Sequence, residues 1–245
     1  MPPRLRGLTK STGLLRHPFD EQFGVRTSGL VAGRDLHSGH AHDRHATAYY
    51  GVAPSVFMQM LIRWQRTRPV GPLSQYTFID IGAGMGRALL LASTLPFRAV
   101  RGVEFHPALV RIARRNLTFW RREGRAVTPV RISIADATSL RFPSGPCVCF
   151  LFNPFGALVL RRFLKHAAQS FAARPGQLDI LYVNNEQEPV LERARGFQRL
   201  FHGRIRRSRA DYRAERAILL HQPDGEYAAH PYEDCSTWRF VGPRT

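Results

Sequence analysis

The fold of this 245-residue chain is decided by the stretch TFIDIGAGMG at residues 77–86. Its first half is typical of a buried strand, because apolar residues surround the single carboxylate Asp80. Gly82 then lets the chain turn sharply, and Gly84 has no Cβ to keep the backbone away from a ligand. A helix is expected at 87–95, with its first N–H groups facing the same space. The stretch therefore predicts a strand, a glycine turn and a helix that together form a ligand site.

The glycine spacing separates two classes of ligand. A dinucleotide fingerprint has the pattern G-x-G-x-x-G or G-x-G-x-x-A, whereas here the third glycine, Gly86, comes one residue early and Arg87 follows it. Asp80 lies two residues before the first glycine, where its charge would repel a pyrophosphate. It would favour a cationic ligand such as S-adenosylmethionine, which carries an ammonium and a sulfonium group. A nicotinamide-dependent dehydrogenase is therefore disfavoured.

Strand and helix patterns alternate along the chain. Strands are expected at 77–84, 99–105, 130–137, 147–155 and 178–185, and helices from Pro54 and at 87–95, 107–122, 158–171 and 188–195. Two further strands, 197–205 and 216–222, are expected to form an antiparallel hairpin with no long helix between them. This order predicts an α/β fold with a doubly wound, mostly parallel sheet and a helical N-terminal extension.

Three acidic residues are expected at the ends of three successive strands. Glu104 ends AVRGVEF and could accept hydrogen bonds from both ribose hydroxyls of a nucleoside. Asp136 ends VRISIADA and could accept from the exocyclic amine of adenine, while backbone amides near Ala137 serve the ring nitrogens. Because Lys and Arg number 36 against 18 Asp and Glu, finding Asp80, Glu104 and Asp136 at three strand ends predicts a nucleoside pocket that attracts positive charge.

The order of these motifs resembles that of the class I S-adenosylmethionine-dependent methyltransferases. The resemblance rests on FIDIGAGMGRALLLAS, VRGVEFHPALVRIARRN, ADA and FLFNPF, and it covers about residues 77–185. It implies a seven-stranded sheet ending in an antiparallel hairpin, with S-adenosyl-L-methionine as cofactor. The cofactor contacts that it implies are Asp80, Gly82, Ala83, Gly84, Gly86, Glu104, Asp136 and Ala137. The glycine turn and the following GVE strand also look like those of the non-SET histone-lysine methyltransferases and of small bacterial relatives.

Two residues outside these motifs are candidates for the reacting end of the site. Asn153 closes the fourth strand, where amino-methylating DNA and RNA enzymes carry Asn/Asp-Pro-Pro-aromatic; the second proline is missing here, so a base amine is not the expected target. Tyr50 belongs to a segment that covers the cofactor in related enzymes. A turn role for Asn153 and plain packing of Tyr49 and Tyr50 are the alternatives. Glu186 and His45 are candidate general bases.

The remaining segments predict the domain organisation. Residues 1–45 are expected to form a basic leader or lid, 46–222 the methyltransferase domain and 223–245 a C-terminal tail. The leader contains the histidine cluster HSGHAHDRH at 37–45, whose spacing fits no zinc signature, so no metal site is expected.

Composition leaves the methyl acceptor open. The formal net charge is +18, and Lys10 and Lys165 are the only lysines. Such a charge attracts nucleic acid, although scattered arginine also follows from a GC-rich coding sequence. The expected acceptor is a protein or small-molecule nucleophile. The alternatives are an RNA methyltransferase and a non-catalytic nucleic-acid-binding protein with a vestigial pocket.

The expected compartment and the expected state of the cysteines rest on three motifs that the sequence lacks. No apolar run reaches the roughly 20 residues that span a bilayer. No secretory signal is evident, so a cytoplasmic protein without a membrane partner is expected. Cys147, Cys149 and Cys235 form no C-x-x-C pair and are expected to be buried as small apolar side chains.

Overall fold

One seven-stranded sheet organises the protein. The computed structural model describes residues 16–33, 36, 47–220 and 228–243, and its strands are ordered β3-β2-β1-β4-β5-β7-β6. The strands are β1 (Thr77–Ile81), β2 (Ala99–Glu104), β3 (Val130–Ile134), β4 (Cys147–Phe152), β5 (Leu178–Val183), β6 (Phe197–Arg206) and β7 (Tyr232–Phe240). Strands β1 to β5 are parallel, and β7 pairs antiparallel with both β5 and β6. The predicted mostly parallel sheet with an antiparallel C-terminal hairpin is confirmed.

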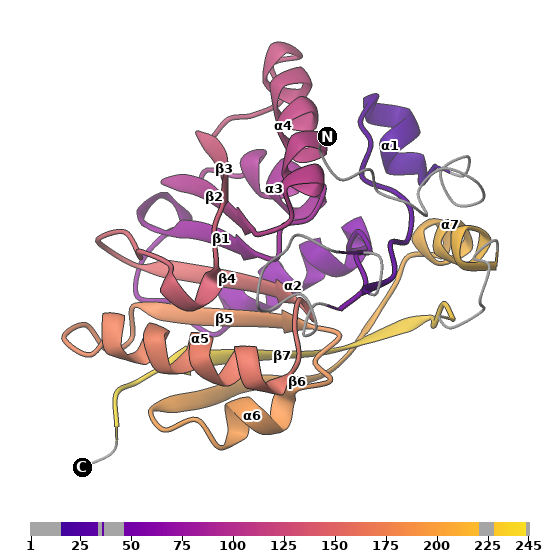
Figure 1. Cartoon of the computed structure of the whole chain (residues 1–245). Helices are drawn as coiled ribbons and strands as arrows, with labels where there is room; N and C mark the ends of the chain where they lie inside the picture. The colour runs from indigo at the N-terminus through magenta and orange to yellow at the C-terminus, as the bar shows by residue number, and fades with distance from the viewer. Residues whose placement is uncertain (1–15, 34–35, 37–46, 221–227, 244–245) are drawn as a thin grey trace.

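Helices cover both faces of this sheet (Figure 1). One face carries α2 (Pro54–Arg66), α3 (Arg87–Ser93) and α4 (Pro107–Arg122), and the other carries α5 (Ala157–Ser170) and α6 (Glu188–Glu192). Two more helices, α1 (Pro18–Phe23) and α7 (Arg209–Leu220), lie beyond the carboxyl ends of the parallel strands. Short 3₁₀ turns, η3 (Leu73–Gln75) and η4 (Ala137–Ser139), complete the elements. The molecule is a three-layer α/β/α sandwich, as strand–helix alternation requires.

The residues whose spacing predicted the helix α2 are also the residues that this helix buries. Pro54 occupies its first turn, where a missing N–H costs nothing. Its apolar side chains at spacings of three and four are all buried, and Trp64 donates its Nε1–H to Asp179 Oδ2 at 2.7 Å. The indole thus joins the helix to β5 through both packing and a hydrogen bond.

The central strands are buried on both faces. All five residues of β1 are buried, and five of the six residues of β4 are buried as well, which accounts for the continuous apolar run CVCFLF. Cys147, Cys149 and Cys235 have no exposed surface, so the prediction that they pack as apolar side chains is confirmed.

The predicted strand at 216–222 is wrong. Residues 209–220 form the helix α7, and the second strand of the hairpin is β7, which lies in the segment predicted to be a tail. The inward face of α7 carries Asp211 and Glu215 besides Ile218 and Leu219, so polar residues interrupt its apolar period. β7 then runs between β5 and β6 rather than at the sheet edge.

Candidate functional site

A pocket opens where the first four strands of the parallel sheet end. Its acidic side chains are Asp80 of β1, Glu104 of β2 and Asp136, which follows β3. Residues 47–52 line its outer side, and we call them the covering segment. In open α/β sheets, ligands bind at this edge. We call it the strand-end pocket.

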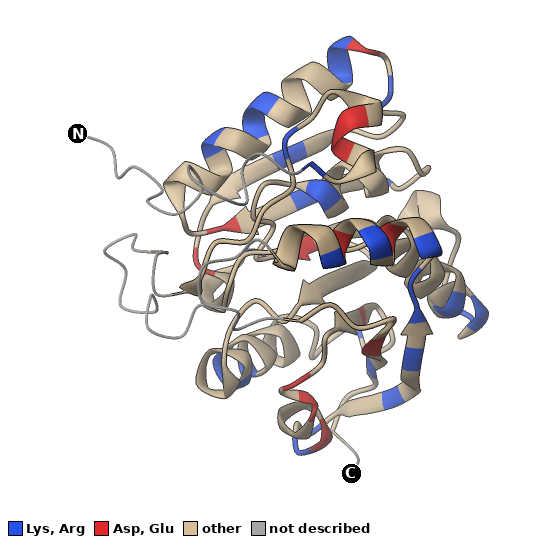
Figure 2. Cartoon of the chain, turned by 90° about the vertical axis from the view of Figure 1, so that its right-hand side faces the viewer, with Lys and Arg blue, Asp and Glu red and all other residues tan. Residues whose placement is uncertain are grey.

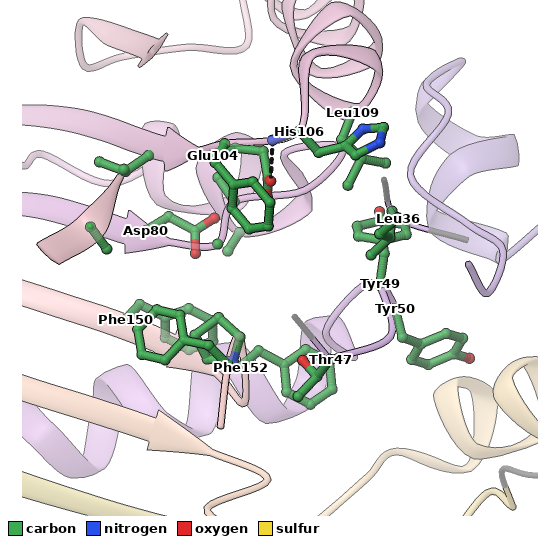
Figure 3. Close-up of a pocket in the computed structure, with 18 of the residues that line it drawn as sticks. Leu36, Thr47, Tyr49, Tyr50, Asp80, Glu104, His106, Leu109, Phe150 and Phe152 are labelled. Carbon is green, nitrogen blue, oxygen red and sulfur yellow. Dashed lines mark hydrogen bonds between the residues drawn. The ribbon is translucent and has the colours of Figure 1, made fainter. Parts of the chain in front are cut away.

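The rest of the strand-end pocket is largely apolar. Phe150 and Phe152 lie across the pocket from Asp80 and Glu104 (Figure 3). Further apolar lining comes from Leu36, Val52, Ala83, Ala88, Val103, Phe105, Leu109, Ala135, Ala137, Pro154, Phe155 and Val159. Two carboxylates thus face an aromatic wall in a space of low polarity, which suits a ligand with one cationic end and one flat apolar part.

Asp80 is a buried acid without a compensating donor. It is 4% exposed, and no hydrogen bond or ion pair reaches it from the described part of the chain. Burial, and then the neighbouring Glu104, raise the pKa of its carboxyl to about 8. A carboxyl in this environment gains most from a cationic ligand group, because such a group offsets both effects.

Glu104 is held by the backbone. Its Oε2 accepts from the Gly84 N–H and its Oε1 from the His106 N–H, both at 2.9 Å. Burial raises the pKa of this carboxyl, while these hydrogen bonds lower it. The predicted position at the end of β2 is confirmed, and the carboxylate is oriented by the loop on one side and by the start of α4 on the other.

The amides of the glycine turn are already paired. Gly82 and Ala83 donate their N–H groups to the Val103 carbonyl at 2.9 and 3.1 Å, and Gly86 donates to the Ala83 carbonyl at 2.8 Å. With Gly84 bonded to Glu104, four amides of the turn have protein acceptors. The turn is therefore no cradle for a pyrophosphate.

The absent side chains of two glycines serve close packing within the protein. A Cβ on Gly84, whose φ is +52°, would lie 2.1 Å from Tyr49 Cε2. A Cβ on Gly82 would lie 2.5 Å from Pro154 Cβ. The sequence predicted that Gly84 lets a ligand approach; here the ring of Tyr49 occupies that space. Gly82 and Ala83 line the pocket, whereas Gly84 and Gly86 are not among the lining residues.

Asp136 both lines the pocket and caps η4. Its Oδ1 accepts from the N–H and the hydroxyl of Thr138, each at 2.8 Å. Ala137 lies beside it at the same edge. The structure thus brings Asp136 and Ala137 to the predicted wall, and their contact with an adenine ring stays a prediction.

Asn153 shapes the pocket without lining it. Its φ of +39° is in the left-handed region, and its Oδ1 accepts from the Tyr182 hydroxyl at 3.2 Å. Its carbonyl accepts from the Thr47 hydroxyl, which joins the covering segment to the end of β4. The following Pro154 and Phe155 do line the pocket. A direct substrate contact of Asn153 stays a prediction.

Tyr50 lies at the rim and points outward. Its ring lines the pocket, while its hydroxyl points away from Asp80 and Glu104 towards α7 (Figure 3). That hydroxyl is buried without a hydrogen-bond partner in the described chain, and burial, then Glu215, raise the pKa of the phenol far above its ordinary value. In this environment, Tyr50 is no proton acceptor at neutral pH.

A polar network missed from the sequence fastens the covering segment. Arg87, 3% exposed, donates to the Thr27 hydroxyl at 2.7 Å and to the Gly51 carbonyl at 3.1 Å, and lies 3.9 Å from Asp20. Asp20 in turn accepts four hydrogen bonds from Thr27 and Ser28. The sequence identified Arg87 only as the residue that follows the glycine turn. Its partners lie 35 to 67 positions earlier in the chain, so no local sequence pattern could predict them.

The candidate bases stand apart from the pocket. Glu186 is exposed, accepts from Asn184 Nδ2 at 3.4 Å and is not among the lining residues. His45 and the histidine cluster at 37–45 lie outside the described residues. Within those residues, no group of three or more His, Cys, Asp and Glu side chains is placed to hold a metal ion. In the same part of the chain, no helix is long and apolar enough to cross a bilayer.

Comparison with known proteins places the fold. No protein-family model matches this sequence, and no curated protein matches it either. Among solved structures, the 4+2 cyclase SpnF is 19% identical, with 77% of this chain and 81% of that chain covered and a TM-score of 0.50. The chain has a Rossmann-like α/β fold. Magnesium protoporphyrin IX methyltransferase from Synechocystis PCC 6803, solved with bound S-adenosylmethionine, is 13% identical, with 76% of each chain covered and a TM-score of 0.46.

A third similar structure is the precorrin-6y C5,15-methyltransferase from Geobacter metallireducens GS-15. It is 16% identical, with 73% of this chain and 85% of that chain covered and a TM-score of 0.44. Likeness at these identities shows the fold alone, so the reaction has to be argued from the pocket.

Proposed function

We propose that this protein binds S-adenosyl-L-methionine in the strand-end pocket and transfers its methyl group to a nucleophile. The observation that carries the proposal is the pair of buried carboxylates, Asp80 and Glu104, of which Asp80 has neither a hydrogen-bond donor nor a cation beside it in the described chain. These carboxylates favour a cationic ligand group, and the arginine of the lining, Arg87, is already engaged by Thr27, Gly51 and Asp20.

The pocket residues fit this cofactor group by group. Asp80 would pair with the ammonium group, and its pKa would fall as it does so. Glu104 would accept from the ribose hydroxyls, exchanging hydrogen bonds that it now receives from Gly84 and His106. Asp136 and Ala137 would meet the adenine edge, with apolar side chains on either side of the ring. Asp80, Glu104, Asp136 and Ala137 are four of the eight contacts that the resemblance implied.

The chain's own contribution to the transfer is binding, orientation and exclusion of water. When bound, the cofactor supplies an activated methyl group on a sulfonium, so in-line displacement needs no metal. Tyr49 and the Thr47–Asn153 hydrogen bond hold the covering segment over the strand ends. Phe150 and Phe152 keep the reacting space apolar, where a positioned nucleophile reacts without a hydration shell. The likeness to non-SET histone-lysine methyltransferases stays a prediction.

Thermal unfolding with added ligands tests the cofactor assignment. S-adenosylmethionine at about 100 times its dissociation constant should add about 2.7 kcal/mol to the free energy of unfolding. NAD at the same concentration should add nothing, because the paired amides of the glycine turn leave no cradle for its pyrophosphate. If folded protein, freed of co-purified ligand, responds equally to both compounds or to neither, the proposal is wrong.

The acceptor is found with methyl-labelled cofactor and a cell extract. We expect label in protein or small molecules, as the missing second proline after Asn153 disfavours a base amine. Digesting the extract with nuclease beforehand should leave this transfer intact. Loss of the label after digestion would instead establish the alternative, an RNA methyltransferase. Tight, salt-sensitive RNA binding by a protein with no cofactor response would support the non-catalytic alternative.

A further inference from the structure

A basic groove runs along the outer side of α4, against the exposed edge of the sheet. It is lined by Arg111, Arg114, Arg115 and Arg122 together with the half-exposed Ile134 of β3. All four arginines are exposed, and β3 is the edge strand of the sheet. Figure 2 shows the basic residues repeating along α4, the helix at the top of Figure 1.

Within the described chain, the charge of this groove is compensated only at its far end, where Glu123 lies beside Arg122. Arg111, Arg114 and Arg115 have no acidic partner in the described chain, and α4 contains no Asp or Glu. The nearest acid in sequence, Glu123, follows the last turn and lies 3.7 Å from Arg122. Residues three, four and seven apart share one helix face, so these guanidinium groups form one stripe about 16 Å long.

The groove also leads to the strand-end pocket. α4 begins at Pro107, directly after His106, which lines that pocket, and Leu109 of its first turn lines it too. Pro107 is at the same time part of the groove. A chain molecule lying along the stripe would therefore reach the mouth of the pocket.

A second concave basic surface shows what is particular about the first. Arg161, Lys165, Arg193 and Arg195 lie around a groove between α5 and α6, and they too have no acidic partner in the described chain. There, however, the basic residues come from α5 and from the segment that follows α6, so they do not form one stripe along a single helix. The four arginines of the α4 groove all lie on one helix, and that helix leads to the strand-end pocket.

We propose that the α4–β3 groove is a binding site for the phosphodiester backbone of a nucleic acid. Arginine forks bind phosphate oxygens with two parallel hydrogen bonds, and a stripe of them fits a chain of phosphates better than a single anion. The site is independent of the reaction in the strand-end pocket, since it requires neither cofactor nor catalysis. A nucleic acid seated there would be an anchor for the molecule that enters the pocket, or a separate ligand.

The test is fluorescence anisotropy with a labelled 20-nucleotide RNA and the same sequence as DNA, at several salt concentrations and without cofactor. The wild-type protein should bind with a dissociation constant of about 1–100 µM near physiological salt, and more weakly as salt rises. The triple variant Arg111→Gln, Arg114→Gln, Arg115→Gln should lower the slope of log K against log salt by about 2 to 3, or about 0.7–0.9 for each lost phosphate contact.

The matched control is the triple variant Arg161→Gln, Lys165→Gln, Arg193→Gln, which removes the same number of positive charges, three, from the α5–α6 groove. It should bind almost as the wild type does, and circular dichroism should show both variants folded. Equal weakening by both triple variants would overturn the site in favour of overall charge. Binding of poly-glutamate as tight as that of RNA and DNA would overturn it in favour of an acidic protein. Absence of wild-type binding would overturn it outright.

Discussion

Asp80 makes the empty protein less stable than it would be without a carboxylate. Its pKa is raised from 3.8 to about 8 in the folded chain, first by burial and then by Glu104. The folded state therefore holds a proton that the unfolded state has lost between these two values. The cost of the ionised Asp80 carboxyl is therefore absent below about pH 4, and the protein loses stability as the pH rises from there through about 8.

Replacing Asp80 by Asn should therefore stabilise the empty protein at pH 8 while abolishing its response to cofactor. We expect a gain of about 0.5–2 kcal/mol in the free energy of unfolding, as is common when a functional group is removed from a site. Denaturant unfolding at pH 5 and pH 8, with and without S-adenosylmethionine, measures both effects. A variant that is less stable at pH 8 and still binds the cofactor would contradict the site.

Gly84 tests whether the glycine turn serves the protein or the ligand directly. In Gly84→Ala, the new Cβ overlaps Tyr49 and the residue keeps a positive φ, so Tyr49 must move off the turn. Gly124→Ala is the control, because its φ is +66° and nothing lies within 4 Å of the new Cβ. The control should lose about 1–2 kcal/mol of stability from backbone strain alone.

Gly84→Ala should lose about 1–3 kcal/mol more than this control, since overpacking adds to the strain. It should also bind S-adenosylmethionine more weakly, whereas Gly124→Ala should bind it normally. Urea unfolding and thermal shift report the two quantities. Equal stability losses in both variants would mean that Tyr49 yields without cost.

At the scale of elements, the covering segment is fastened by charge as well as by packing. Arg87 of α3 and Asp20 of α1 are both buried, and their hydrogen bonds converge on Thr27 and Ser28. Arg87→Met should cost about 3–5 kcal/mol, because it leaves Asp20 buried without its cation. Adding Asp20→Asn to Arg87→Met should then cost less than the two single losses combined, with a coupling of about 1 kcal/mol or more in a double-mutant cycle. Strict additivity would show that the two groups do not interact.

The same scale explains which elements could be predicted. The strand, turn and helix around Gly82 are encoded within residues 77–93, and neighbouring parallel strands bring Asp80 and Glu104 to one edge whatever the loops do. α7 was mistaken for a strand because its buried face includes Asp211 and Glu215, which no apolar period would count. The Tyr49 ring over Gly84 and the partners of Arg87 depend on a distant segment folding back, so sequence spacing carries no sign of either.

At the scale of the whole molecule, the C-terminal segment is a structural necessity. β7 pairs with β5 over residues 235–239 and with β6 over residues 232–240, although its sequence YEDCSTWRF is too polar to be recognised as an inner strand. A chain ending after residue 222 should therefore lose cooperative folding, because β6 loses its neighbour in the described sheet and β5 loses one of its two. Near-ultraviolet circular dichroism and binding of a hydrophobic dye would show this. A chain ending after residue 243 should behave as the full chain, and native-like unfolding of the shorter chain would contradict the role given to β7.

The three thiols give this sheet its own reporters. Cys147 and Cys149 lie on β4 in the middle of the sheet and Cys235 on β7, all without exposed surface, and burial raises the pKa of Cys147 to about 12. Alkylating reagents attack the thiolate form of an accessible cysteine. We therefore expect these three cysteines to react only after the strand that carries them separates from the sheet. The order in which the cysteines are modified would show whether the antiparallel hairpin or the centre of the sheet opens first. This sequence of unfolding events can be followed without any engineered cysteine.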